Sequence, residues 1–198
     1  HILCFGKCLK LMSHQNLYLN LEIALNIGVF DRFNINDLFD DSRKTFISYL
    51  AEVDMPVLKT ANDWSFYSCQ FMTSLNLPEV TTIGQGAFQS LYSLKGKLVF
   101  PKLKTLSVQA FYSCSHITSV ELTSIEFIGN NAFKNAEALS ELVIGTSNCE
   151  LGGRNALDRT SSSLIIYVPD EAVNWYKSAT NWSYYASKIK PMSERVIS

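Results

Sequence analysis

A cysteine and a histidine stand two residues apart near the middle of the chain, at Cys114 and His116. A histidine within hydrogen-bonding reach of a thiol can take its proton, and the thiolate that remains is a strong nucleophile. The pair is therefore the first candidate for catalysis. Its activity depends on where the fold places Cys114, because burial in apolar surroundings keeps a thiol protonated.

A second group of reactive side chains lies near the start of the chain, at Cys4, Cys8 and His14. Thiolates and imidazoles bind zinc, so these three residues could form a metal clip. The set is looser and less complete than that of known zinc sites, and we expect no metal there. The chain has five cysteines, an odd number, which argues against a fully paired disulfide framework.

Carboxylates that could serve as general acids or bases are scattered, for example Glu79, Glu121 and Glu126. Each lies between apolar positions, so we expect them to be solvated. The sequence contains no glycine-rich phosphate loop, no paired metal-ligand motif and no nucleophile elbow. We therefore expect neither enzymatic activity nor a cofactor.

The element that positions all of these residues is a repeat. IGQGAFQS at 83–90 returns as LSVQAFYS at 106–113 and as IGNNAFKN at 128–135. Aligned on the Ala-Phe pairs, the units are 22 or 23 residues long and start at Val53, Leu75, Leu98, Val120, Leu142 and Leu164. A period in this range predicts a solenoid of the leucine-rich type.

Apolar residues recur at equivalent positions of the units, and the most regular of these columns is a phenylalanine: Phe66, Phe88, Phe111 and Phe133. A small residue precedes each of them: Ser65, Ala87, Ala110 and Ala132. A coil of this length cannot bury its apolar side alone, so like side chains should stack on like. The alternation at the start of each unit predicts a parallel strand. The residues after the phenylalanine should form a helical turn or an irregular segment, with a short helix at 133–141. We expect a right-handed leucine-rich repeat solenoid of the α/β superhelix class.

The repeat also places the candidate nucleophile. Cys114 shares an apolar column with Cys69, Leu91 and Ala136, which predicts a buried, inert thiol. Cys69 and Cys114 should lie two coils apart, about 10 Å, which is too far for a disulfide.

The units drift toward the ends of the chain. In the fifth unit a two-residue slip puts Leu157, preceded by Ala156, in place of the phenylalanine, and the sixth unit stops early.

In residues 17–29 apolar and other residues alternate, as they do in a strand. We expect one structural domain with a divergent cap or degenerate repeats at 1–52, a repeat array at 53–168 and a helical cap at 169–198. Asp170 should cap a helix from 171 to about 179.

Composition limits the partners. The net charge is −1, which argues against nucleic acid, and 47% of the residues are hydrophobic, which argues against disorder. No stretch approaches the ~18 apolar residues of a membrane span.

The best units are LNLPEVTTIGQGAFQSL at 75–91, LVFPKLKTLSVQAFYSC at 98–114 and VELTSIEFIGNNAFKNA at 120–136. They resemble the BspA-type leucine-rich repeats of bacterial surface proteins, whose unit is similar to L-x-L-P-x-x-(V/L)-T-x-I-G-x-x-A-F-x-x-C. The third unit has Thr in place of Pro. The resemblance covers about residues 53–194. It implies a secreted or cell-surface bacterial protein that takes part in adhesion to host matrix proteins, other cells or surfaces.

Solenoids usually bind through the outward side of their sheet. The predicted outward column is Asp54, Asn76, Val99, Glu121, Val143 and Ile165. Its three apolar members would form an interaction stripe if they lie side by side and if neither the terminal tail nor a neighbouring domain covers them. A second outward column, Lys59, Thr81, Lys104 and Glu126, mixes charges and should be an ordinary wet surface.

Five aromatic residues crowd the tail: Trp175, Tyr176, Trp182, Tyr184 and Tyr185. They could form a stacking platform for sugar rings or could cover the last coil of the array. The sequence thus predicts a non-enzymatic protein-binding or adhesion module whose partner is a host or bacterial surface protein, or a glycan. The alternatives are a carbohydrate-binding module that uses the tail aromatics and an accessory region of a larger surface protein.

Overall fold

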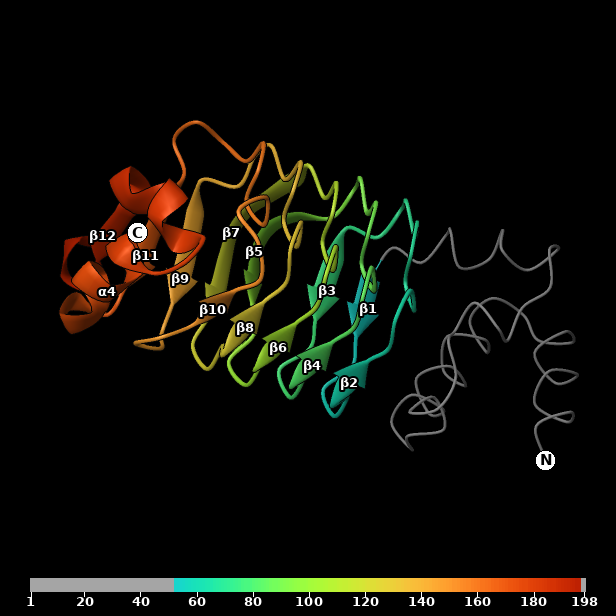
Figure 1. Cartoon of the computed structure of the whole chain (residues 1–198). Helices are drawn as coiled ribbons and strands as arrows, with labels where there is room; N and C mark the ends of the chain where they lie inside the picture. Colours follow the sequence, from blue (N-terminus) through green and yellow to red (C-terminus); the bar gives the residue numbers. More distant parts are fainter. Residues whose placement is uncertain (1–51, 197–198) are drawn as a thin grey trace, which may run out of the picture.

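The structure is a computed structural model that describes residues 52–196. The expectations for the preceding residues, including the strand at 17–29, the N-terminal cap and the Cys4, Cys8 and His14 clip, lie outside this range. From residue 52 onward the chain winds through successive coils, and each of the first five coils adds one short strand to each of two parallel ladders (Figure 1).

The first ladder, here called the front ladder, is the predicted one. Its strands are all parallel, and they form a two-stranded sheet, β1 with β3, and a five-stranded sheet in the order β12, β11, β9, β7, β5. The predicted first column stays in register where strands pair, because Val53 lies beside Leu75, and Val120 lies between Leu98 and Leu142. Its strands are β1 (Glu52–Asp54), β3 (Ser74–Asn76), β5 (Lys95–Val99), β7 (His116–Leu122), β9 (Glu141–Ile144), β11 (Ile165–Val168) and β12 (Ile189–Pro191).

The second ladder was not predicted. Its strands have only two residues each. In the first three units the first residue is a threonine and the second is an apolar residue that points inward. The inward residues, from Ala61 to Leu151, are buried in the shared core. The strands are β2 (Thr60–Ala61), β4 (Thr82–Ile83), β6 (Thr105–Leu106), β8 (Phe127–Ile128) and β10 (Glu150–Leu151).

The phenylalanine column fills the interior, as predicted. The rings of Phe66, Phe88, Phe111 and Phe133 are buried, and consecutive rings stack nearly parallel with centroids 5.1, 5.2 and 5.6 Å apart. Stacked aromatic rings at this separation stabilise a core beyond the burial of their surface. The first four coils therefore each contribute a phenylalanine ring to one continuous stack.

The small residue before each phenylalanine has a backbone role. The backbone N–H of each phenylalanine donates a hydrogen bond to a carbonyl oxygen in the next coil, that of the alanine in the small column. Phe88 donates to Ala110 at 2.9 Å, and Phe111 donates to Ala132 at 2.8 Å. These bonds require close approach of neighbouring turns, which a large side chain would prevent. The small column thus holds the turn segments together where no strand exists.

The predicted short helix at 133–141 is wrong. The segment is a series of turns closed by hydrogen bonds from Ala136 N to Phe133 O and from Leu139 N to Ala136 O. Asn135 has a φ of 62°, in the left-handed region, which interrupts a right-handed helix. The equivalent residues Ser68, Ser90 and Ser113 have φ values of 59–62°, so the same kink recurs in four coils.

A compact helical segment closes the C-terminal end of the array, where α4 and η2 contact β12 (Figure 1). Its elements are η2 (Asp170–Ala172), α4 (Val173–Ser178), η3 (Trp182–Lys188) and η4 (Met192–Glu194), with β12 between the last two. Asp170 does not cap the helix: no side chain caps η2 or α4, and the Asp170 carboxylate instead accepts a hydrogen bond from the backbone N–H of Ser193 at 3.0 Å. This bond ties the end of the tail to the start of the helical segment.

Two of the tail aromatics cover the last coil, as one of the two alternatives predicted. Tyr176 and Trp182 are fully buried. The Tyr176 hydroxyl accepts from Cys149 N at 3.0 Å and donates to Thr146 O at 2.7 Å, and the Trp182 indole N–H donates to Cys149 O at 2.7 Å. These side chains form hydrogen bonds with backbone N–H and C=O groups of the last coil. At an open edge, those backbone groups would be free to pair with another chain.

Candidate functional site: the outer side of the front ladder

The predicted outward column exists, in two blocks. Asp54 lies beside Asn76 in one block, and Glu121 lies between Val99 and Val143 in the other. The blocks belong to two sheets, since β3 and β5 are not paired as strands. Five of the six predicted residues therefore hold the positions that the repeat assigns to them.

Ile165 is the exception, and its assignment to this column is wrong. Ile165 pairs with Glu141, and the neighbour of Val143 is Tyr167. The reason is the two-residue slip in the fifth unit: Leu142 pairs with Ile166, so the last interval is 166 − 142 = 24 residues. The sixth unit therefore begins at Ile166, two residues after the predicted Leu164.

One end of this outer side is open to solvent. We call it the open half, and its residues are Asp54, Asn76, Lys97 and Val99. All four are exposed, and Val99 is 44% accessible, which is high for an apolar side chain on a strand. The Asn76 amide donates to the Asp54 carboxylate at 2.9 Å, so these two polar side chains are held in a fixed arrangement.

The other end, which we call the covered half, contains Glu141, Val143 and Tyr167. Val143 is 2% exposed and Tyr167 is buried. The tail folds back beside them after η4, and the Arg195 guanidinium contacts the Glu141 carboxylate at 2.9 Å and the Glu121 carboxylate at 3.5 Å. Ser119 donates a further hydrogen bond to Glu141 at 2.8 Å.

These contacts shift the ionisation of the carboxyls. The hydrogen bond from Arg195 lowers the pKa of Glu141. At Glu121 the ion pair with Lys97, whose Nζ lies at 2.8 Å, is the larger cause of a lowered pKa, and Arg195 adds to it. Both carboxylates are therefore charged at neutral pH and occupied by cations of the same chain.

The predicted apolar stripe does not form. Val99 is exposed, but Glu121 separates it from the buried Val143, and Ile165 lies outside the column. Among Asp54, Asn76, Val99, Glu121 and Val143, Val99 is the one exposed apolar side chain. The surface that remains for recognition is therefore the open half.

The column Lys59, Thr81, Lys104 and Glu126 carries charge pairs. Lys104 contacts Glu126 at 2.9 Å, and the nearby Glu79 carboxylate lies between Lys59 at 2.6 Å and Lys102 at 2.5 Å. Hydrogen bonds from Lys102 and Lys59 lower the pKa of Glu79 to about 2. Paired, solvent-facing carboxylates of this kind do not act as proton acceptors at neutral pH.

The Cys114 and His116 pair is not assembled for nucleophilic chemistry. Cys114 is fully buried, its thiol donates to Phe88 O at 3.1 Å, and burial raises its pKa to about 12. His116 points away, is exposed, and contacts the Ser115 hydroxyl at 3.0 Å. The prediction of a buried thiol is confirmed for Cys114 and for Cys69, and both are free.

Metal binding and membrane insertion are two further possibilities for residues 52–196. In that range no three His, Cys, Asp or Glu side chains gather as metal ligands. No helix there has the length and apolar character needed to cross a bilayer.

The chain was compared with known proteins. A family model, the BspA-type leucine-rich repeat region, matches residues 47–185 in six copies, which is more than half of the chain. No curated protein matches the sequence significantly. The repeat period, the stacked columns and the family match agree, and the chain belongs to the BspA-type leucine-rich repeat family.

Proposed function

We propose that this chain is a non-enzymatic protein-binding module of a secreted or surface-exposed bacterial protein, and that it serves adhesion through the open half. Leucine-rich repeat modules generally bind proteins, and the BspA type is typical of bacterial surface proteins. The observation that carries the proposal is the exposure of Val99, an apolar residue of a strand, among the polar residues of the open half.

The residues around Val99 have the arrangement of a small interface. Productive protein interfaces place an apolar contact at the centre and polar groups at the rim. Val99 supplies the apolar contact, while Asn76, Asp54 and Lys97 supply hydrogen-bonding and charged groups of both signs around it. A partner with a complementary apolar side chain and mixed charges would fit this pattern.

The fold supports such a role because the surface is preorganised. The strands that carry these residues are fixed by the stacked interior, and the Asn76 amide is held by Asp54. A surface that is already ordered loses little conformational entropy on binding, which leaves more of the contact energy as affinity.

The test is a binding screen of the immobilised chain against purified host matrix proteins and surface proteins of other bacteria. A charge at the centre of the interface, introduced as Val99→Glu, should weaken binding at least about tenfold, which corresponds to ~1.4 kcal/mol. Val108→Glu is the matched control, because Val108 is also an exposed valine, at 37%, and lies in a turn segment away from the front ladder. Both variants should melt like the wild type. Equal loss in both variants, or loss only in the control, would remove the open half from the proposal.

A further inference from the structure

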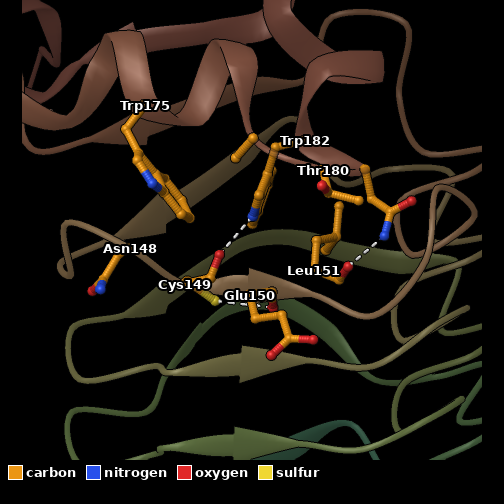
Figure 2. A pocket seen from close by; sticks show the side chains of 9 residues that line it. Asn148, Cys149, Glu150, Leu151, Trp175, Thr180 and Trp182 are labelled. Carbon is orange, nitrogen blue, oxygen red and sulfur yellow. Dashed lines mark hydrogen bonds between the residues drawn. The ribbon is translucent and has the colours of Figure 1, made fainter.

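A hollow of about 250 Å³ lies where the helical segment meets the last coil, and we call it the cap hollow (Figure 2). The turn before β10 and β10 itself supply Asn148 and Glu150. Trp175 comes from α4, and Thr180 lies between α4 and η3. The cap hollow is separate from the open half, because α4 and β10 lie toward the C-terminal end of the array, whereas the open half is carried by β1, β3 and β5 (Figure 1).

One wall of the cap hollow is an exposed aromatic ring. Trp175 is 42% accessible, although Trp182 and Tyr176 of the same segment are fully buried. The Trp175 ring meets the Tyr176 ring edge-on, with centroids 4.9 Å apart and an interplanar angle of 87°. Tyr176 is itself fixed by its two backbone hydrogen bonds, so Trp175 has a rigid support.

The floor of the cap hollow is also rigid. The Trp182 indole N–H donates to Cys149 O at 2.7 Å, and the Asn181 amide donates to Leu151 O at 2.7 Å (Figure 2). These bonds use the indole N–H of Trp182 and one N–H of the Asn181 amide, so those two donors are not available to a ligand. They fix the distance between the helical segment and the last coil, and the hollow is preformed.

The rim carries polar groups that are available. Asn148, Glu150 and Thr180 are exposed. Within residues 52–196 their side chains have no hydrogen-bond or ion-pair partner. Together they offer an amide, a carboxylate and a hydroxyl, which can donate and accept hydrogen bonds.

We propose that the cap hollow binds a single uncharged pyranose ring of a glycan. The C–H face of a pyranose is apolar and can lie on the exposed Trp175 ring, while its hydroxyls reach the groups of the rim. The volume is just below the ~300–1,000 Å³ of sites for drug-sized ligands, which suits one ring rather than an extended oligosaccharide. This site is separate from the protein-binding surface proposed above.

The charge of the rim selects among sugars. Glu150 is a carboxylate, and the residues that line the cap hollow include neither lysine nor arginine. A sialic acid or a uronic acid would place a second negative charge beside Glu150 without a cation to compensate it, so acidic sugars should be rejected.

A lysine side chain of a protein partner is the competing ligand. A cation over an indole with a nearby carboxylate would be attracted. An aromatic cage for a cation needs more than one accessible ring face. Trp182 is fully buried, so Trp175 presents the single exposed ring face among the residues that line the hollow. The mixed hydrogen-bonding rim favours hydroxyls over an ammonium group.

The experiment uses the whole chain and saturation-transfer NMR with glucose, galactose, mannose, N-acetylglucosamine, sialic acid and a lysine-containing peptide. At least one uncharged sugar should bind, and Trp175→Ala should weaken that binding at least about tenfold. Trp175→Phe should restore part of it, because a smaller ring remains. Tyr184→Ala is the matched control: Tyr184 is a 64% exposed aromatic of the same tail that does not line the hollow.

Three results would overturn the inference. They are the absence of binding by all four uncharged sugars at millimolar concentration, stronger binding of sialic acid or of the peptide, and equal loss in the Trp175 and Tyr184 variants. Val99→Glu should leave sugar binding unchanged. Failure of the cap hollow and failure of the open half can therefore be told apart.

Discussion

The two halves of the outer side differ although one repeat builds both. In the open half Val99 faces solvent, whereas in the covered half Val143, in the same column of the ladder, is 2% exposed. The strands beneath them present the same kind of inward residues. The tail lies at the covered half, where its Arg195 reaches back to Glu121 and Glu141. A repeat thus fixes which side chains point outward, and the end of the chain decides which of them remain available.

The largest effect on stability is expected from a substitution in the phenylalanine stack, which is buried beneath both halves. Phe111→Ala should lower the free energy of unfolding by about 3–5 kcal/mol, because Phe111 is buried and stacks on Phe88 and Phe133. Chemical denaturation monitored by circular dichroism measures it. Tyr92→Ala, which removes an exposed ring, is the control and should change little. An unaltered midpoint for Phe111→Ala would mean that the two halves share no common interior.

The stacked interior was predictable because the first four coils repeat phenylalanine at intervals of 22 or 23 residues. The second ladder was not, since strands of two residues, such as Thr82–Ile83, are too short to show alternation. The false helix at 133–141 has a similar cause: Phe133, Ala136 and Leu139 recur every three residues, a spacing that a series of turns produces as readily as a helix does. The left-handed φ of Asn135 decides between them.

A second prediction compares two tryptophans of the helical segment that covers the end of the array. Trp182→Ala should destabilise by about 3 kcal/mol, because it removes a fully buried ring and a hydrogen bond to Cys149. Trp175→Ala removes a partly exposed ring that packs edge-on against Tyr176 and should cost only about 1 kcal/mol. Thermal unfolding of both variants under identical conditions measures the difference. Similar melting temperatures would mean that the helical segment does not stabilise the covered half.

The third prediction concerns the Arg195 contact. Arg195→Met should reduce stability by about 1 kcal/mol at neutral pH, since the ion pairs are only partly buried. The folded-state pKa values of Glu121 and Glu141 are lowered, so their contribution is present above the ordinary glutamate pKa of ~4.3 and is lost as the pH falls through the folded-state values. The variant and the wild type should therefore converge in acid.

Lys102→Met is the control for that experiment. Lys102 contacts Glu79, and the pKa of this carboxyl is lowered to about 2, but the pair stands in solvent. Water screens such pairs, so the variant should melt almost like the wild type at neutral pH. A larger effect at Lys102 than at Arg195 would contradict the view that the tail contact matters more than a surface ion pair.

The candidate site could be predicted only in part from the sequence. The repeat placed Asp54, Asn76, Val99, Glu121 and Val143 correctly, because the period holds through the first five units. Ile165 was misplaced because the two-residue slip, visible at Ala156 and Leu157, also shifts the unit that follows. The covering of Val143 had no local signal, since Arg195 lies 54 residues from Glu141 and 74 from Glu121 along the chain. The cap hollow likewise joins residues about 30 positions apart.

The most direct measurement of the difference between the halves is the rate of thiol labelling by a maleimide. Single cysteines are introduced as Val99→Cys and Val143→Cys in a chain whose Cys4 and Cys8 are replaced by serine. The remaining cysteines, Cys69, Cys114 and Cys149, are buried with pKa values raised to about 12, so they should stay silent in the folded protein. The cysteine at 99 should react nearly as fast as in the unfolded chain, and the one at 143 should react orders of magnitude more slowly. Equal rates at the two positions would contradict the division of the outer side into an open and a covered half.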